Sequence, residues 1–84
     1  MRFAVRVDVR LRPGIADPEG STIERALPAL GFEGVEGVRV GKTFRFSLEA
    51  ADEAAARAGA REMADRLLAN PVIEDADVVV ETAA

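Results

Sequence analysis

The sequence contains no cysteine and no histidine among its 84 residues. Without cysteine the chain has no thiol nucleophile, no thiolate metal site and no disulfide framework. Without histidine it also lacks the commonest general base, the commonest metal ligand and the usual pH switch of proteins. We therefore expect no catalytic residue, no metal and no cofactor in this chain, and we expect its function to lie in surfaces that bind partners.

An excess of positive charge and a long apolar run are missing as well. Eleven Lys and Arg residues stand against fifteen Asp and Glu residues, which gives a net charge of −4. This balance disfavours nucleic acid as a partner. No window approaches the roughly 20 apolar residues that span a bilayer, and the alternating N-terminus is unlike a signal peptide. We therefore expect a cytoplasmic protein that binds neither nucleic acid nor membrane.

The composition is that of an ordinary globular protein, with 49% hydrophobic and 31% charged residues. A length of 84 residues predicts a single domain over residues 1–84. A domain of this size buries only about 60–65% of the surface of its unfolded chain, so a second chain would usefully cover part of the remainder. Self-association is therefore expected.

Four segments have the composition of β-strands. Apolar and charged residues alternate over residues 3–11, which predicts a strand with one buried face and one face open to solvent or to a polar partner. Residues 35–40 and 44–48 are expected to form a hairpin with Gly41 in its turn, and a short last strand is expected at residues 77–81. The face away from the core is predicted to carry Arg6, Asp8, Arg10, Arg45, Ser47 and Glu49.

The first helix has two possible starts. In one, Asp17 is the N-cap and Pro18 takes the first helical position, where its missing N–H has no cost. In the other, Ser21 and Glu24 form a capping box. The first start is favoured. Pro28 is expected to kink or fray the end of this helix because it removes a backbone hydrogen bond. The apolar stripe of the helix comprises Ile23, Ala26, Leu27 and Leu30.

A second helix is predicted to begin after Asp52 and to end at Asn70 and Pro71, because proline disfavours helical backbone in the residue before it. Its apolar stripe comprises Ala56, Ala60, Met63, Ala64 and Leu67, and Val72 and Ile73 are expected to anchor the chain after it. The element order is then β-α-β-β-α-β. This order is typical of the α+β ferredoxin-like fold, a four-stranded antiparallel sheet with two helices on one face.

The residues that could carry chemistry are better explained by structure. The carboxylates between Glu74 and Asp77 have no base or nucleophile beside them, which favours a solvated acidic turn over a catalytic or metal site. The glycines between residues 31 and 41 fit no phosphate-binding fingerprint and are expected in turns. A small basic cluster of Arg39, Lys42 and Arg45 is typical of a strand edge that is kept soluble.

Four short blocks, spread along nearly the whole chain, have the order and spacing of sequence blocks in one known protein family. They are RPGIADPEG at residues 12–20, ALPALGF at 26–32, VRVGK at 38–42 and LLANPVIED at 67–75. Together they resemble the PurS family, the small subunits of phosphoribosylformylglycinamidine synthase. Each block alone is weak evidence for the resemblance, whereas all four in the same order and spacing are specific for the family.

The resemblance implies a non-catalytic adaptor in a ligase of purine biosynthesis. Such enzymes convert formylglycinamide ribonucleotide, glutamine and ATP to the formylglycinamidine ribonucleotide. The family implies that a homodimer, or a dimer of dimers, holds the glutaminase subunit against the large synthetase subunit, so that ammonia passes between them protected from water. ATP and magnesium are then expected on the synthetase subunit and not on this chain.

The resemblance also selects individual residues. The positions with structural roles are Gly14, Asp17, Pro18, Gly20, Gly41, Asn70 and Pro71. Local structure does not require the side chains of Arg39, Lys42 and Glu74, so these three are expected to contact other subunits. Two residues depart from the usual pattern of the family. Pro28 bears on the geometry of the first helix, and Ala76, where an aromatic residue is common, bears on the packing of the last strand.

Two other functions are compatible with the element order. A regulatory module similar to ACT domains would bind a small amino acid at a dimer interface in a saturable way. An enzyme similar to acylphosphatases, suggested by the short segment VEGVR at residues 35–39, would hydrolyse an acyl phosphate by itself. That family's catalytic asparagine has no clear counterpart here, so this alternative is disfavoured.

Overall fold

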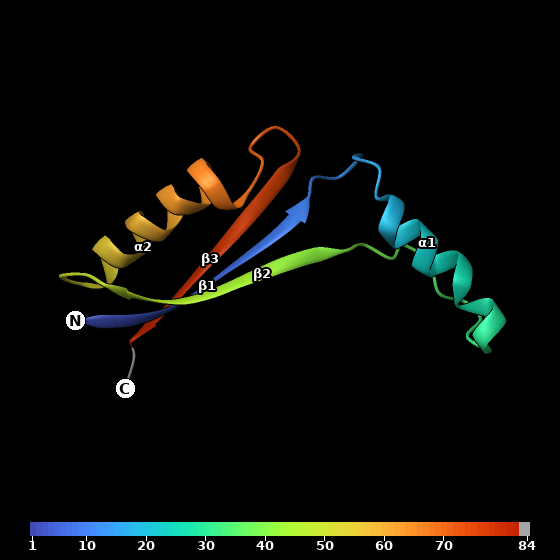
Figure 1. Cartoon of the computed structure of the whole chain (residues 1–84), viewed down its shortest axis with the longest axis horizontal. Coiled ribbons are helices and arrows are strands. Elements are labelled where there is room, and N and C mark those ends of the chain that lie inside the picture. Colours follow the sequence, from blue (N-terminus) through green and yellow to red (C-terminus); the bar gives the residue numbers. More distant parts are fainter. Residues whose placement is uncertain (83–84) are drawn as a thin grey trace.

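The computed structural model describes residues 1–82. Its elements are β1 (Arg2–Leu11), α1 (Pro18–Ala26), the 3-10 turn η1 (Pro28–Leu30), β2 (Gly41–Glu49), α2 (Glu53–Met63), the π-helical turn η2 (Ala64–Leu68) and β3 (Glu74–Thr82). The strands form one antiparallel sheet in the order β2-β1-β3 (Figure 1). The predicted α+β class is confirmed, but within residues 1–82 the sheet has three strands and not four.

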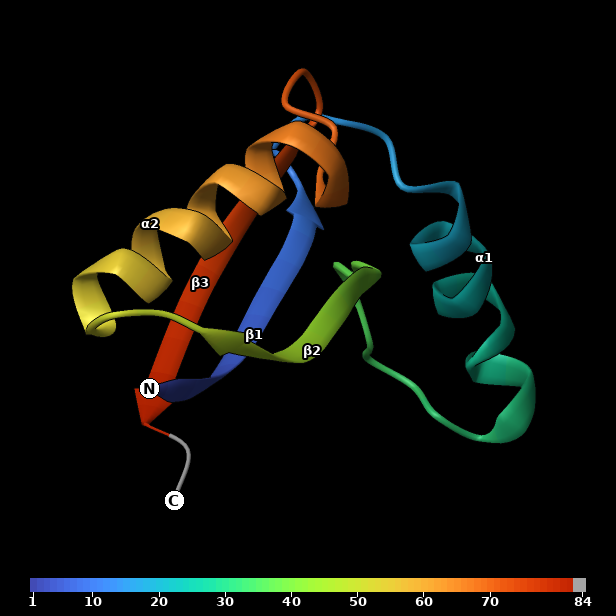
Figure 2. The ribbon, with the colours of Figure 1, turned by 60° about the vertical axis from the view of Figure 1, so that its left-hand side comes forward.

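β1 is the central strand, and its alternating pattern places the core as predicted. Phe3, Val5, Val7 and Val9 are each at most 3% exposed. α2 lies across this face of the sheet (Figure 2) and presents alanines that are fully buried, which lets helix and sheet approach closely. Apolar residues of the flanking strands pack around this core and are only partly buried: Phe44, Phe46, Leu48 and Val78.

α2 begins as predicted, because the side chain of Asp52 accepts a hydrogen bond from the N–H of Ala55 at 2.8 Å. Its end differs. The N–H of Ala69 donates to the carbonyl of Ala64 at 2.9 Å, five residues earlier, which widens the last turn and rotates the side chains that follow. Leu67 is consequently 83% exposed.

The prediction of Leu67 as a core residue is therefore wrong, and Leu68 packs against the core in its place. Met63 and Val72 were also predicted to face inward, yet they are 38% and 76% exposed. The π-helical turn explains why a strict helical period fails after Ala64. The predicted stop at Asn70 and Pro71 is confirmed by the end of η2 at Leu68.

The predicted hairpin between residues 35 and 48 does not form. Residues 33–40 adopt no strand conformation. Gly34 and Gly37 have φ angles of +81° and +75°, in the left-handed region that interrupts an extended backbone. Gly41 does not turn the chain; it is the first residue of β2 and pairs with Arg10 of β1. β3 is longer than predicted and begins three residues earlier, at Glu74.

α1 stands apart from the sheet (Figures 1 and 2). Pro28 ends the regular helix at Ala26 and begins η1, as its missing amide predicts, and Gly31 closes that turn with a φ of +94°. The predicted placement of both helices on one face is wrong, since only α2 covers the sheet. The isolated chain therefore leaves the apolar residues of this segment uncovered: Ile23, Leu30, Phe32 and Val35 are 42%, 70%, 58% and 44% exposed.

The overall dimensions agree with an incompletely covered chain. The radius of gyration is 16.5 Å, whereas a compact domain of this length has about 12 Å. The accessible surface is 5803 Å², against about 4,800 Å² for a typical monomer of the same mass. The difference is about 1,000 Å², close to the roughly 800 Å² that each partner contributes to a standard interface.

Candidate functional site

Most of the residues selected from the sequence meet at one end of the sheet, where α1 follows β1 and β2 begins. An open hollow of about 520 Å³ lies there. Its lining comes from segments that are distant in sequence: Val9, Leu11, Asp17, Pro18, Glu19, Val40, Gly41, Lys42 and Glu74. We call this region the junction hollow. The fold thus gathers positions from the first, third and fourth sequence blocks into one surface.

Asp17 organises the junction hollow. Its carboxylate is buried, and Oδ1 accepts a hydrogen bond from the N–H of Gly20 at 2.8 Å, which confirms the favoured start of the first helix. Oδ2 accepts a second hydrogen bond from the N–H of Val40 at 2.7 Å. The guanidinium Nε of Arg39 lies 4.0 Å from the same oxygen. One carboxylate therefore caps α1 and ties it to the start of β2.

Glu24 makes a second tie between α1 and the segment before β2. Its Oε1 accepts a hydrogen bond from the N–H of Val38 at 3.0 Å. Gly20 lies beneath the same segment, and a Cβ added there would be 2.2 Å from the carbonyl oxygen of Val38. Sequence reasoning identified Asp17 as a cap but missed its bond to Val40 and the role of Glu24. These partners are 23 and 14 residues apart, and no local pattern signals such pairs.

Hydrogen bonds from the backbone amides of Val40 and Gly20, with a smaller contribution from Arg39, hold the pKa of Asp17 below its ordinary value of 3.8, although desolvation opposes them. A lowered pKa in the folded state means that the carboxylate contributes stability above about pH 4, and that this contribution is lost as the pH falls toward the folded pKa.

In Asp17→Asn the free energy of unfolding should therefore fall less steeply than in the wild type as the pH is lowered from 5 to 2. Urea unfolding at a series of pH values in this range measures the difference. The same pH dependence in the variant and the wild type would contradict this role of Asp17.

The glycines selected from the sequence are required, though not always for the predicted reason. Gly14 has a φ of +86° in the turn after β1, which suits glycine. Gly41 is needed for close approach, because a Cβ there would lie 2.7 Å from the carbonyl oxygen of Val9. The position of Gly41 thus depends on strand pairing and not on a hairpin turn.

The three predicted contact residues differ in how far the chain itself uses them. Glu74 accepts a hydrogen bond from the N–H of Asn70 at 2.7 Å and so closes the turn after η2. Arg39 donates to the carbonyl of Arg12 at 3.4 Å. The side chain of Lys42 makes no ion pair or hydrogen bond with the other residues of the described part of the chain, and its Nζ lies 5.8 Å from a phenyl ring centroid on its own strand. Of the three, Lys42 is the most available to a partner.

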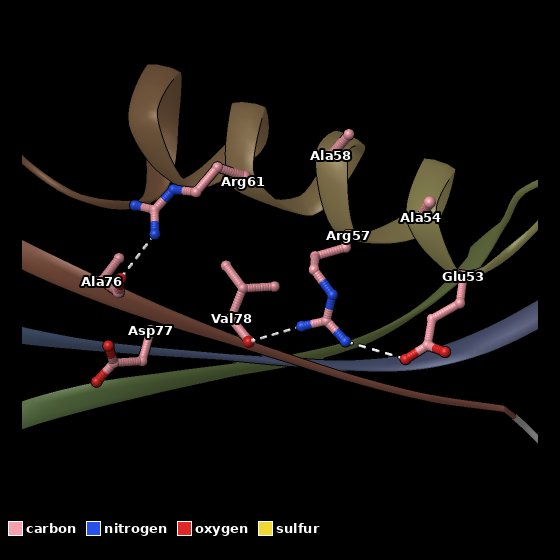
Figure 3. A pocket seen from close by; sticks show the side chains of 8 residues that line it. All are labelled: Glu53, Ala54, Arg57, Ala58, Arg61, Ala76, Asp77 and Val78. Atoms are coloured by element: carbon pink, nitrogen blue, oxygen red, sulfur yellow. Dashed lines mark hydrogen bonds and ion pairs between the residues drawn. The ribbon is translucent and has the colours of Figure 1, made fainter.

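Another hollow, of about 730 Å³, lies elsewhere, between α2 and β3. Figure 3 shows Arg57 and Arg61 reaching from α2 toward β3, where they donate to the carbonyls of Val78 at 3.5 Å and Ala76 at 2.8 Å. β3 is an edge strand, so its outward carbonyls would otherwise be open to another strand. We interpret this hollow as a protected sheet edge.

The described residues contain no set of groups suited to catalysis by metal. Over residues 1–82 no cluster of three or more acidic side chains is placed to hold a metal ion. The same residues include no helix that is both long and apolar enough to cross a membrane. Three exposed regions are therefore the candidates for binding a partner: the junction hollow, the uncovered apolar residues after α1, and the sheet face opposite α2.

Comparisons with known proteins agree on one family. Residues 4–82 match the family model "PurS: Phosphoribosylformylglycinamidine (FGAM) synthase". A PurS subunit from a Synechocystis strain is 47% identical over 73 residues, which cover 87% of this chain and 73% of that protein. The PurS subunit of Methanocaldococcus jannaschii is 39% identical, with 94% and 95% covered.

Solved structures agree with the sequence comparisons. The crystal structure of Methanocaldococcus jannaschii PurS, described as one of the subunits of formylglycinamide ribonucleotide amidotransferase in the purine biosynthetic pathway, has a TM-score of 0.87 at 36% identity and covers 98% of this chain and 99% of that one. A chain in the structure of PurLQS from Thermotoga maritima has a TM-score of 0.88 at 32% identity, with 96% and 99% covered.

Proposed function

The chain belongs to the PurS family of phosphoribosylformylglycinamidine synthase subunits, and from this premise we propose that it is the non-catalytic adaptor of that enzyme in purine biosynthesis. In this role it holds the glutaminase subunit against the synthetase subunit, so that ammonia from glutamine reaches formylglycinamide ribonucleotide in an ATP-dependent amidation. ATP and magnesium bind to the synthetase subunit, and the complex works in the cytoplasm.

One observation carries the proposal: a chain with this fold, a TM-score of 0.88 and 32% identity is present in the PurLQS structure from Thermotoga maritima. The chemistry of the sequence supports it, because a chain without histidine and cysteine lacks the usual nucleophiles and bases of glutamine hydrolysis. An ACT-like regulatory role has no comparable support, since the family model and the relatives described above are PurS.

We further propose that the adaptor acts as a homodimer or as a dimer of dimers. The apolar residues after α1 are uncovered, and the core face of β2 is only partly buried because α1 stands away from it. Another copy that lays its α1 against this sheet would bury both surfaces and complete the two-helix cover of a ferredoxin-like unit. The excess accessible surface of about 1,000 Å² is of the size such a contact needs.

Arg39, Lys42 and Glu74 are proposed as contacts to the other subunits. Lys42 and Glu74 both line the junction hollow, and Arg39 is held beside it by Asp17. The chain's own hydrogen bonds leave Lys42 the most available of the three, as described above. Lys42→Ala is therefore the cleanest of the three substitutions, because it removes a side chain that the chain itself does not use.

The test is reconstitution. With the purified glutaminase and synthetase subunits, glutamine, ATP and formylglycinamide ribonucleotide, we expect glutamine-dependent product formation only when this chain is added. Ammonium chloride in place of glutamine is the control, since free ammonia should bypass the adaptor. Glutamine-dependent activity that is the same without this chain would refute the proposed function.

A further inference from the structure

The sheet face opposite α2 carries two like charges in direct opposition. Arg6 on β1 is paired with Arg45 on β2 in the strand register. Both side chains point away from the buried face, because their neighbours Val5, Val7 and Phe46 turn toward α2. Like charges directly opposite on one face of an antiparallel pair destabilise it. The stability of the isolated chain therefore gives no reason for this pair.

No acidic residue of the same face forms an ion pair with Arg45, although Asp8 attracts it at longer range. Asp8 lies 3.1 Å from Nε of Arg6 and is shared with a threonine hydroxyl, and Asp77 forms an ion pair with Arg10. Arg45 itself has no ion pair with any other residue between positions 1 and 82. On this face Arg6 and Arg10 thus have carboxylate partners, while the guanidinium of Arg45 on β2 has none within ion-pair distance.

A hollow of about 400 Å³ opens beside the two arginines. It is lined by Ala4, Val5, Arg6, Arg45, Phe46, Ser47, Val79 and Glu81. Ala4 and Ser47 oppose each other in the row next to the arginine pair, and their small side chains leave room for an incoming group. α2 lies on the other face (Figure 1), so nothing in the described chain covers this hollow.

We propose that this surface, formed by Arg6, Arg45, Ala4, Ser47 and Val79 and called here the arginine face, docks an acidic patch of a partner subunit. A carboxylate of that patch enters between the guanidiniums of Arg6 and Arg45. Arginine binds carboxylates through paired hydrogen bonds, and the contact strengthens when water is excluded. The proposal rests on the adaptor function proposed above, since it names the chemistry of the partner.

A second copy of the chain fits this surface less well than a different protein. Self-pairing of two arginine faces would bring two such arginine pairs together. Of the carboxylates that could separate them, Asp8 and Asp77 are already held by Arg6 and Arg10, and each copy adds one more, Glu81, which lines the same hollow. A different protein with an acidic patch supplies more carboxylates to this surface than a second copy does.

The test uses Arg45→Glu in the full chain, titrated into the glutaminase subunit, into the synthetase subunit and into both together. We expect affinity for one of them to fall at least about tenfold, as charge reversal in a docked ion pair predicts. The melting temperature of the variant should be unchanged or higher, because a glutamate opposite Arg6 replaces repulsion with attraction. Arg66→Glu, at a 77% exposed site on η2, is the matched control and should bind like the wild type.

The outcomes separate the inference from the function on which it rests. Absence of binding by the wild-type chain would overturn both. Wild-type binding with equal binding by Arg45→Glu would overturn the arginine face and leave the adaptor intact. If Arg45→Glu instead dissociates the chain's own oligomer while each chain still binds the partners normally, the face joins copies of this chain and the proposal is wrong. Restoration of Arg45→Glu binding by an acid-to-arginine change in the partner would support it directly.

Discussion

Gly20→Ala should lower the free energy of unfolding by about 3 kcal/mol, although alanine is the better helix former. The added Cβ would lie 2.2 Å from the carbonyl oxygen of Val38, and this oxygen belongs to the backbone and cannot swing aside. Moving the backbone at Val38 strains the hydrogen bonds that the N–H groups of Val38 and Val40 donate to the carboxylates of Glu24 and Asp17. We therefore expect the whole tie between α1 and β2 to loosen.

Gly59→Ala is the matched control for this prediction. Gly59 lies inside α2, and a Cβ there would be 3.7 Å from a methyl carbon of Leu48, which is ordinary contact. The substitution should raise the free energy of unfolding by about 0.5–1 kcal/mol, through helix propensity. Urea unfolding followed by circular dichroism, at one fixed protein concentration, measures both variants. Equal effects at the two glycines would show that the contact with Val38 is not the cause.

The parts of the fold that local chemistry determines were predictable from the sequence. The alternation along β1 predicted the core face. Asp17 and Asp52 predicted the starts of both helices, because each side chain accepts a hydrogen bond from the amide three residues ahead. The missing fourth strand and the misplaced first helix share another origin. Residues 35–40 were predicted as a strand from their valines, but the amides of Val38 and Val40 donate hydrogen bonds to carboxylates of α1 and its N-cap.

The residues of the candidate site also divide into those that could be predicted from the sequence and those that could not. Sequence blocks selected Asp17, Gly20 and Gly41, and the structure explains each by a close backbone approach or a shared carboxylate. The opposition of Arg6 and Arg45 was not predictable, although both residues were placed on the open face. Which residues face each other depends on the register between β1 and β2, where Arg6 and Arg45 are 39 residues apart in sequence. A period of two in each strand does not fix that register.

Phe32→Asp should weaken self-association at least about a hundredfold while leaving the chain folded. Phe32 is 58% exposed in the single chain, so loss of its ring costs the monomer little. The N–H of Phe32 bonds to the carbonyl of Leu27 through the backbone, which the substitution retains. Burial of such a ring is worth about 1.5–3 kcal/mol, and in a two-fold symmetric dimer each substitution occurs twice.

Light scattering and sedimentation across a range of protein concentrations measure the oligomeric state, with circular dichroism as the check on folding. Val72→Asp is the control, because Val72 is 76% exposed in the turn after η2, far along the chain from α1. If the adaptor works as a dimer, Phe32→Asp should also lose glutamine-dependent activity in reconstitution and regain it at high protein concentration. An oligomer unchanged by Phe32→Asp would mean that another protein covers the apolar residues after α1, and that copies of this chain meet through a different surface.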